Sequence, residues 1–249
     1  MRQETLFISD LHLKASEPFK VQRFLSFLNT RAASVERLFI LGDLFDAYLG
    51  DDDQSFPFGA VKKALKTLTD QGTAVYFQSG NRDFLVGEDF SRETGVELLG
   101  DMTIIDLYGT PTLLMHGDLL CTDDLSYQAA RIRVRTPEWR SYALGKPLWM
   151  RKLYARWYRF KSGLDKQGKT MEIMDVNQDA VFNALEDAEV FRLIHGHTHR
   201  PQIHFIQLPG GEAERLVLPE WTESASVWVY SEGSRHQEVI GDPPDKTLS

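Results

Sequence analysis

Five short apolar runs, rich in β-branched and aromatic residues, predict buried strands along the chain. They cover residues 6–8, 38–41, 74–77, 112–115 and 191–194. Between them lie stretches with the i, i+3, i+4, i+7 spacing of one buried helix face, and a further helix is expected to begin after Asn177 as its N-cap. Strands that alternate with helices predict an α/β layered fold with largely parallel sheets. The helical positions are Val21, Phe24, Leu25 and Leu28, then Val61, Ala64, Leu65 and Leu68, then Val181, Ala184, Leu185 and Ala188.

Beyond Pro201 the pattern changes to strands without helices. Apolar runs cover 203–208, 216–218 and 227–230, and Pro209-Gly210-Gly211 lies between the first two. This arrangement predicts antiparallel hairpins that complete a sheet.

The composition is that of a globular protein with a sizeable core, in one domain or one domain with an insertion. The chain has 249 residues, of which 42% are hydrophobic and 26% are charged. It has neither a secretory apolar region nor an apolar run long enough to span a bilayer, so we expect a cytosolic protein, and a monomer. Its one cysteine, Cys121, cannot form an intramolecular disulfide and is expected to be a buried apolar residue rather than a nucleophile.

The net charge of −8 is unevenly distributed. Residues 122–170 hold 12 lysine and arginine residues against 4 acidic residues, so this segment carries about +8 and the rest about −16. The sequence therefore predicts an acidic core, residues 1–121 and 171–249, with a basic, aromatic helical cap at 122–170. The acidic run Asp51-Asp52-Asp53 is expected to be a solvated turn.

Each of the five predicted strands is followed at once by a polar cluster that can bind metal. In α/β sheets ligands bind beyond the carboxyl ends of the strands, so the clusters are expected to converge. The D-x-H and H-x-H spacings place side chains i and i+2 on one side of an extended segment. The clusters are Ser9-Asp10-Leu11-His12, Gly42-Asp43-Leu44-Phe45-Asp46, Gly80-Asn81-Arg82-Asp83, His116-Gly117-Asp118 and His195-Gly196-His197-Thr198-His199.

These side chains favour particular metals. Imidazoles together with carboxylates suit Mn, Fe or Zn better than Mg or Ca, which prefer shells of oxygen alone. A single histidine at a strand end is usually structural, but five clusters in this order indicate a metal centre. The candidate ligands are too many for one open site, and two ions that share one carboxylate would use them all.

The motifs D-x-H, G-D-x-x-D, G-N-x-D, H-G-D and G-H-x-H, in this order, resemble the calcineurin-like metallophosphoesterase family. The resemblance implies a four-layered α/β/β/α sandwich and two divalent ions. It implies that Asp43 bridges the ions. In that family the first ion is held by residues that match Asp10, His12, Asp43 and His199 here, and the second by those that match Asp43, Asn81, His116 and His197.

One position departs from the family pattern. Most members carry histidine after the asparagine of the G-N motif, usually as general acid, whereas this chain has Arg82. Arginine cannot supply a proton at ordinary pH, because its pKa exceeds about 12, so we expect Arg82 to clamp a phosphate. A leaving group that is itself a phosphate needs little protonation, which points to a pyrophosphate substrate.

Arg82, the HGHTH form of the last motif, the Asp175-Val176-Asn177 segment and the basic insertion resemble one branch of the family over nearly the whole chain. The resemblance implies hydrolysis of UDP-2,3-diacylglucosamine to UMP and 2,3-diacylglucosamine 1-phosphate in lipid A biosynthesis, with manganese, at the cytoplasmic face of the inner membrane. It also implies substrate contacts at residues that match Asn81, Arg82, Asp124, Ser162, Lys166, Lys169 and His197.

Our mechanistic hypothesis is that two metal ions lower the pKa of a water, which attacks the uridine-side phosphorus in line. Asp43 and Asn81 hold the metal centre, while Arg82 and His197 stabilise the developing charge. Asp46 and Asp83 are expected to hold the ligands in place.

Residues 148–160 of the insertion predict a basic amphipathic helix. Its tryptophan and tyrosine residues are typical of an interfacial membrane contact, and equally of a lid whose apolar face packs on its own neighbours; the two are compatible. Lys166 and Lys169 would both face a phosphate or sugar, or be solvated, and Gly163 and Gly168 favour a loop there. One face holds Met150, Leu153, Tyr154 and Trp157 and another holds Lys152, Arg156 and Arg159.

Other functions stay open. One is another phosphoesterase of the same fold, such as a phosphoprotein phosphatase or a cyclic-nucleotide phosphodiesterase. A noncatalytic scaffold would be marked by lost ligands, whereas all seven are present here. A nuclease would suit the basic insertion, but G-N-R-D fits it poorly, so we expect no nucleic-acid partner.

Overall fold

The computed structural model describes residues 2–166, 175–222 and 224–242. Within them the strands form two sheets. One has the order β11 (Ser234–Ile240), β10 (Ala225–Ser231), β1 (Arg2–Ile8), β2 (Val35–Leu41), β3 (Ala74–Gln78) and β4 (Glu97–Leu99). The other has the order β5 (Met102–Leu107), β6 (Thr110–Met115), β7 (Arg192–His195), β9 (Gly211–Val217) and β8 (Ile203–Leu208).

The pairing confirms the expected parallel sheets. Strands β1 to β4 run parallel in one sheet, and β6, β7 and β9 do so in the other. All five strands predicted from apolar runs are present. The hairpin β8–β9 is antiparallel, as expected. Strand β10 pairs antiparallel with β1 and with β11, so the predicted strands beyond Pro201 complete two different sheets rather than one.

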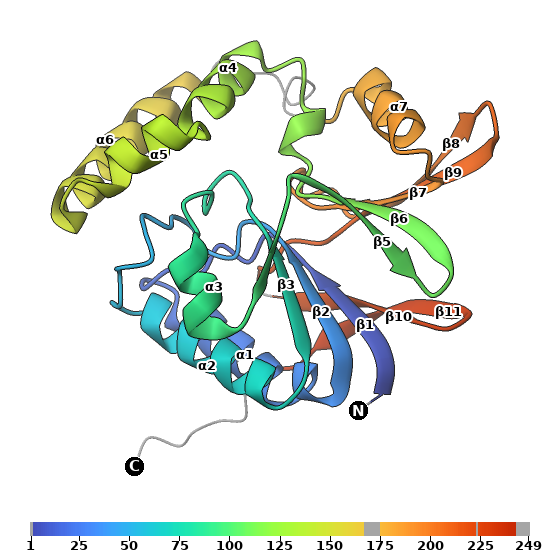
Figure 1. The fold of residues 1–249 in the computed structure, drawn as a ribbon, viewed down its shortest axis with the longest axis horizontal. Helices are drawn as coiled ribbons and strands as arrows, with labels where there is room; N and C mark the ends of the chain where they lie inside the picture. The colour runs from blue at the N-terminus through green and yellow to red at the C-terminus, as the bar shows by residue number, and fades with distance from the viewer. Residues whose placement is uncertain (1, 167–174, 223, 243–249) are drawn as a thin grey trace.

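Three apolar clusters separate four layers. The first lies between the six-stranded sheet and the helices α1 (Pro18–Asn29), α2 (Phe58–Asp70) and α3 (Glu88–Thr94). The second lies between the two sheets, with Phe7 and Phe39 facing Leu114 and Ile194. The third lies between the five-stranded sheet and α7 (Gln178–Asp187). The order is therefore α/β/β/α, and Figure 1 shows α1, α2 and α3 together on one side.

Local sequence features predicted where these helices begin and which faces they bury. Asn177 caps α7 by accepting a hydrogen bond from the backbone N–H of Ala180 at 3.0 Å, as predicted. In α1 the buried face includes Phe27, while Leu25 is only partly buried. Cys121 is buried in the cluster under α7, which confirms the expected apolar role. Two short 3-10 turns, η1 (Ala32–Ser34) and η2 (Asp118–Leu120), complete the core.

Three helices form the basic segment: α4 (Leu125–Val134), α5 (Pro137–Leu144) and α6 (Leu148–Lys166). They lie beyond the strands as a separate arm (Figure 1), and we call them the cap. The loop expected around Gly163 is wrong, because α6 continues to Lys166. Gly168 and Lys169 lie outside the described residues. In the parts of the chain that are described, no helix combines the length and hydropathy needed to cross a membrane.

Candidate metal centre

The candidate ligands lie on strained backbone. Among the described residues, seven non-glycine residues have left-handed φ angles, and five of them are Asp10, His12, Asp43, His197 and His199, with φ from 49° to 71°. Each such residue costs about 1–3 kcal/mol and persists only where its surroundings force the conformation. Strain that gathers on these five residues marks the strand ends as a functional site.

Glycine next to a ligand permits this crowding. A Cβ on Gly42 would collide with the His116 ring, and a Cβ on Gly196 would collide with the Asp10 carboxylate. Gly42 also has a φ of 86°, which other residues rarely adopt. The glycines in these motifs therefore allow ligands from different strands to approach each other.

The first group of candidate ligands is Asp10, His12 and His199. His199 Nε2 lies 3.3 Å from both Asp10 Oδ1 and His12 Nε2. The backbone N–H of His197 donates to Asp10 Oδ2 at 2.8 Å, and Glu220 Oε2 lies 2.7 Å from His199 Nδ1. The sequence analysis missed this contact of Glu220, because Glu220 belongs to no motif. The contact between Glu220 and Nδ1 of His199 leaves Nε2 of His199 directed at Asp10 and His12.

The second group is Asn81, His116 and His197. Asn81 Oδ1 lies 3.2 Å from His116 Nε2 and 3.1 Å from His197 Nδ1, and these ring nitrogens are 3.2 Å apart. His116 Nδ1 lies 2.8 Å from the backbone oxygen of Leu41. Because a carbonyl only accepts, Nδ1 carries a proton, and Nε2 is the ring nitrogen that faces the group.

Asp43 stands between the two groups. Its Oδ2 lies 3.7 Å from His12 Nδ1, and its Oδ1 lies 3.8 Å from His116 Nε2. Oδ1 also accepts the backbone N–H of Arg82 at 2.8 Å. Each oxygen thus faces one group, which is the arrangement a shared carboxylate requires.

Two further carboxylates surround the ligands, as expected. Asp83 is fully buried and accepts the backbone N–H groups of Leu44 at 2.7 Å and Gly80 at 2.8 Å, so it joins the loops that carry Asp43 and Asn81. Asp46 Oδ1 lies 4.0 Å from an Arg82 guanidinium nitrogen, and both side chains are partly exposed.

Burial divides the titrating groups into two kinds. It raises the pKa of Asp43 to about 7, with help from the Asp83 and Asp10 carboxylates. Burial disfavours a charged His116, but Asp43 and Asp10 outweigh it and raise its pKa to about 9. In contrast, burial lowers the pKa of His12 and of His197 to about 4. His12 and His197 are therefore neutral donors at neutral pH, while Asp43 and His116 hold protons that a cation must displace.

The donor set fits a divalent metal. His12 Nδ1 is buried and lacks a hydrogen-bond partner among the described residues. Two sets of potential ligand atoms lie within 4.8 Å of one another, Asp10 with His12 and His199, and Asp10 with Asp43 and His116. Carboxylate and imidazole donors suit Mn, Fe and Zn. Divalent metal binding is thus supported by both geometry and chemistry.

Three of the seven expected substrate contacts lie at the metal centre. Asn81, Arg82 and His197 lie at the centre described above. Asp124 is the N-cap of α4, and its Oδ1 accepts the backbone N–H of Tyr127 at 3.0 Å. The side chains of Ser162 and Lys166, and the whole of Lys169, lie outside the described residues.

Tyr127 and Asp118 connect the cap to the second group. The Tyr127 hydroxyl donates to Asp118 Oδ2 at 2.6 Å, and its ring stacks on His197 with centroids 6.4 Å apart. Arg131 Nε lies 2.7 Å from the same carboxylate oxygen. Asp118 of the H-G-D motif therefore binds the cap. No local feature of the sequence indicates these contacts of Tyr127.

The acidic run at 51–53 includes a turn, as predicted, but it is not simply solvated: Asp52 is exposed, whereas Asp53 is buried. Asp53 is only 3% exposed and lies 2.8 Å from Lys152 Nζ, and Asp52 pairs with Arg151. The partners come from α6, about a hundred residues later, so the local sequence could not show them. The run anchors the cap to the core.

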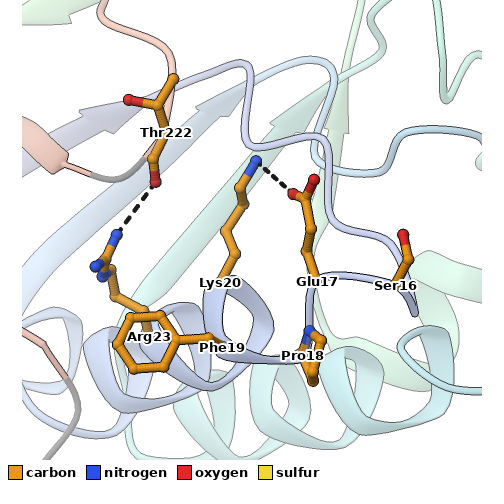
Figure 2. Close-up of a pocket in the computed structure, with 7 residues that line it drawn as sticks. All are labelled: Ser16, Glu17, Pro18, Phe19, Lys20, Arg23 and Thr222. Carbon is orange, nitrogen blue, oxygen red and sulfur yellow. Dashed lines mark hydrogen bonds and ion pairs between the residues drawn. The ribbon is translucent and has the colours of Figure 1, made fainter.

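A cavity of about 610 Å³ lies elsewhere, at the start of α1. Figure 2 shows that its charged groups already have partners: Lys20 pairs with Glu17, and Arg23 donates to the backbone oxygen of Thr222 at 3.2 Å. None of the candidate ligands lines it. The cavity therefore offers no second centre of metal chemistry.

Comparison with known proteins shows the family of this chain and the names of similar proteins. The family described as calcineurin-like phosphoesterase matches residues 4–201. The chain is 49% identical over 235 residues to a UDP-2,3-diacylglucosamine hydrolase of Marinobacter nauticus, covering 94% of this chain and 95% of that protein. Proteins with the same name from Enterobacter sp. and Klebsiella pneumoniae are both 47% identical, over 92% and 90% of this chain and 96% and 93% of theirs.

Proposed function

The chain belongs to the calcineurin-like phosphoesterase family, and from that premise we propose that it hydrolyses the pyrophosphate bond of UDP-2,3-diacylglucosamine. The products are UMP and 2,3-diacylglucosamine 1-phosphate, a step of lipid A biosynthesis. Relatives named for this substrate match 90% or more of the chain. The structural observation that carries the proposal is that seven donor side chains converge at the strand ends with Arg82 beside them.

The proposed ligands divide between two divalent ions, for which we propose Mn²⁺. Bound there, the ions supply Lewis-acid activation of water and of the phosphate oxygens. Asp43 contributes one oxygen to each set, which its position between the groups favours. The first set is Asp10, His12, Asp43 and His199, and the second is Asp43, Asn81, His116 and His197.

Arg82 is proposed to bind the pyrophosphate. Its side chain is 33% exposed, so the guanidinium can meet a substrate, and its planar donors match phosphate oxygens. It cannot act as an acid. The 2,3-diacylglucosamine 1-phosphate that leaves is already a weakly basic phosphate, so the reaction at the uridine-side phosphorus needs no proton from this position. Asn81 and His197 are proposed to contact the substrate as well.

The cap is proposed to receive the acyl chains and to contact the cytoplasmic face of the inner membrane as a peripheral protein. Its apolar side chains are exposed: Trp149 is 67% exposed, Leu153 is 63% and Trp157 is 55%. Large exposed apolar surfaces mark sites of lipid or ligand contact. The same proposal includes a helical cap at 122–170 that is separate from the core, and a monomeric protein. It also includes substrate contacts by Asp124, Ser162, Lys166 and Lys169.

The reaction is tested with purified protein and Mn²⁺ on UDP-2,3-diacylglucosamine, its deacylated analogue and a simple phosphodiester. We expect the acylated substrate to be preferred and, in ¹⁸O-water, the label to enter UMP. Asp43→Asn is expected to be inactive and Asp187→Asn, which alters an exposed acid, to be active. Equal rates on all three compounds would support another phosphoesterase, and label in the sugar phosphate would refute attack at the uridine-side phosphorus.

The membrane contact is tested by flotation with vesicles rich in phosphatidylglycerol. The double substitution Trp149→Ser and Trp157→Ser is expected to reduce the bound fraction while the deacylated analogue is still hydrolysed at its original rate. Phe205→Ser is the matched control, because Phe205 is also exposed, at 63%, but lies on β8. Equal binding by all three proteins argues against a membrane role for the cap.

A further inference from the structure

The loop between β3 and α3, residues 79–87, carries both Asn81 and Arg82, and the cap holds it at each end. At its start, one Arg135 guanidinium nitrogen donates to the backbone oxygen of Gly80 at 2.9 Å. At its end, Arg140 donates to the backbone oxygens of Phe84 and, at 3.1 Å, Val86. Arg135 follows α4 and Arg140 lies in α5, so both come from the basic segment.

The middle of the loop is held by a cation–π contact and a tilted aromatic pair. The Phe84 ring lies 6.0 Å from the Arg135 guanidinium and 6.0 Å from the Trp139 ring. Arg135 is itself fixed, because its other nitrogen lies 2.6 Å from Asp101 Oδ1, and Asp101 also pairs with Arg131. The loop is therefore contacted by the cap along its length.

These contacts act on backbone atoms next to the ligand. Gly80 directly precedes Asn81, whose Oδ1 lies within 3.2 Å of both His116 Nε2 and His197 Nδ1. A change in the carbonyl position of Gly80 moves the Asn81 side chain with it, because the peptide unit is rigid. Arg140, which bonds the loop, is partly buried, and this burial lowers its pKa.

Position, rather than charge alone, distinguishes these arginines. Arg133 lies near the end of α4, two residues before Arg135. It carries the same charge and is exposed. The guanidinium groups of Arg135 and Arg140 instead present several donors in a fixed plane to backbone oxygens, which a lysine ammonium cannot reproduce.

We propose that Arg135 and Arg140 are positioning residues through which the cap sets the geometry of the second metal subsite and of Arg82. The inference rests on the proposed function of that centre. The basic residues of the cap thus serve the metal centre in the core, in addition to any contact with lipid. Displacement of the cap loosens Asn81 and weakens the second ion before it affects the first.

The test is a Mn²⁺ titration of the full chain without substrate, followed by electron paramagnetic resonance of the free ion. Arg135→Ala and Arg140→Ala are expected to weaken the second ion by about 10- to 100-fold, the usual cost of losing an outer-shell partner, and to leave the first unchanged. The lysine variants restore part of the affinity, and Arg133→Ala matches the wild type. With substrate, KM is expected to rise as Arg82 is displaced.

Unchanged affinity for the second ion in both alanine variants overturns the inference, as does an equal loss in Arg133→Ala. If the alanine variants do not fold, Arg135→Lys and Arg140→Lys carry the same test, and wild-type affinity in both overturns it. A wild-type protein that binds two ions but leaves UDP-2,3-diacylglucosamine intact contradicts the proposed reaction only, because the titration needs no turnover.

Discussion

His116 donates its Nδ1 proton to the backbone oxygen of Leu41, 2.8 Å away. Leu41 ends β2 in the six-stranded sheet, whereas His116 follows β6 in the five-stranded sheet. The bond therefore joins the two sheets at the metal centre and directs Nε2 of His116 toward Asn81. The orientation of one candidate ligand depends on how the two sheets pack.

The affinity for divalent metal is expected to rise with pH between about pH 6 and about pH 9. The pKa of Asp43 is raised to about 7 and that of His116 to about 9, so the metal-free centre holds protons that binding must release. His12 and His197, with pKa values lowered to about 4, release none in this range. Calorimetry in buffers of different ionisation enthalpy measures the protons released, and a pH-independent affinity would contradict the expectation.

The same shifts set the stability of the metal-free protein. Both pKa values lie above the ordinary values. The contribution of these two protonated groups to the free energy of unfolding is therefore fully present at low pH and is lost as pH rises through about 7 and about 9. Saturating Mn²⁺ should therefore raise the melting temperature more at about pH 9 than at about pH 6. His116→Gln is the control, because it removes one of the two titrating groups.

Asp43→Asn is expected to lower kcat/KM by more than about 100-fold, since loss of an outer-shell partner alone costs about 10- to 100-fold. The metal-free variant should be at least as stable as the wild type at neutral pH, because the buried carboxylate, with its raised pKa, disfavours the fold when ionised. Urea unfolding with and without Mn²⁺ separates the two effects. A variant that is strongly destabilised without metal would show that Asp43 has a mainly structural role.

Glu220→Ala is expected to weaken the first ion by about 10- to 100-fold and to spare the second. The reason is that Glu220 Oε2 holds His199 Nδ1 at 2.7 Å, so that Nε2 faces Asp10. Glu220→Gln keeps an acceptor of the same size and should lose less. Glu186→Ala, which alters an exposed acid of α7, serves as control. Loss of the second ion instead would contradict the assignment of His199 to the first group.

The fold and the convergence of the candidate ligands were predictable because their signals are local. A strand buried on both faces reads as a continuous apolar run, as in 38–41 of β2, and parallel strands bring the residues after them to one edge. Strand β11 was not predicted, because its residues alternate between partly buried and exposed and many are polar. Such a strand has little apolar pattern to detect.

The contacts that position the ligands were not predictable, because their partners are distant in sequence. Arg135 reaches Gly80 over 55 residues and Arg151 reaches Leu49 over 102. From sequence, these arginines show only that the cap is basic. Their bonds to backbone oxygens depend on how the cap rests on the loops, and a backbone oxygen leaves no trace in residue identity. Glu220, which contacts the His199 side chain, was missed because it belongs to no motif.

Trp221→Ala is expected to cost about 3–5 kcal/mol of unfolding free energy, the usual loss for a large buried aromatic residue. Trp221 is 1% exposed and packs edge-on against Phe24 at 5.9 Å and Phe27 at 5.5 Å. Its backbone N–H also donates to the backbone oxygen of Asp10 at 3.2 Å, so the side chain fixes a segment that supports the first group.

The variant should therefore lose affinity for the first ion as well as stability. Trp221→Phe keeps most of the packing and removes the indole N–H bond to the backbone oxygen of Ser226. Its loss of unfolding free energy should therefore be about 1 kcal/mol, the net value of one hydrogen bond. Trp149→Ala, at an exposed tryptophan, is the control and should change stability little. If Trp221→Ala is destabilised but binds the first ion at wild-type affinity, packing in the core and geometry at Asp10 are independent.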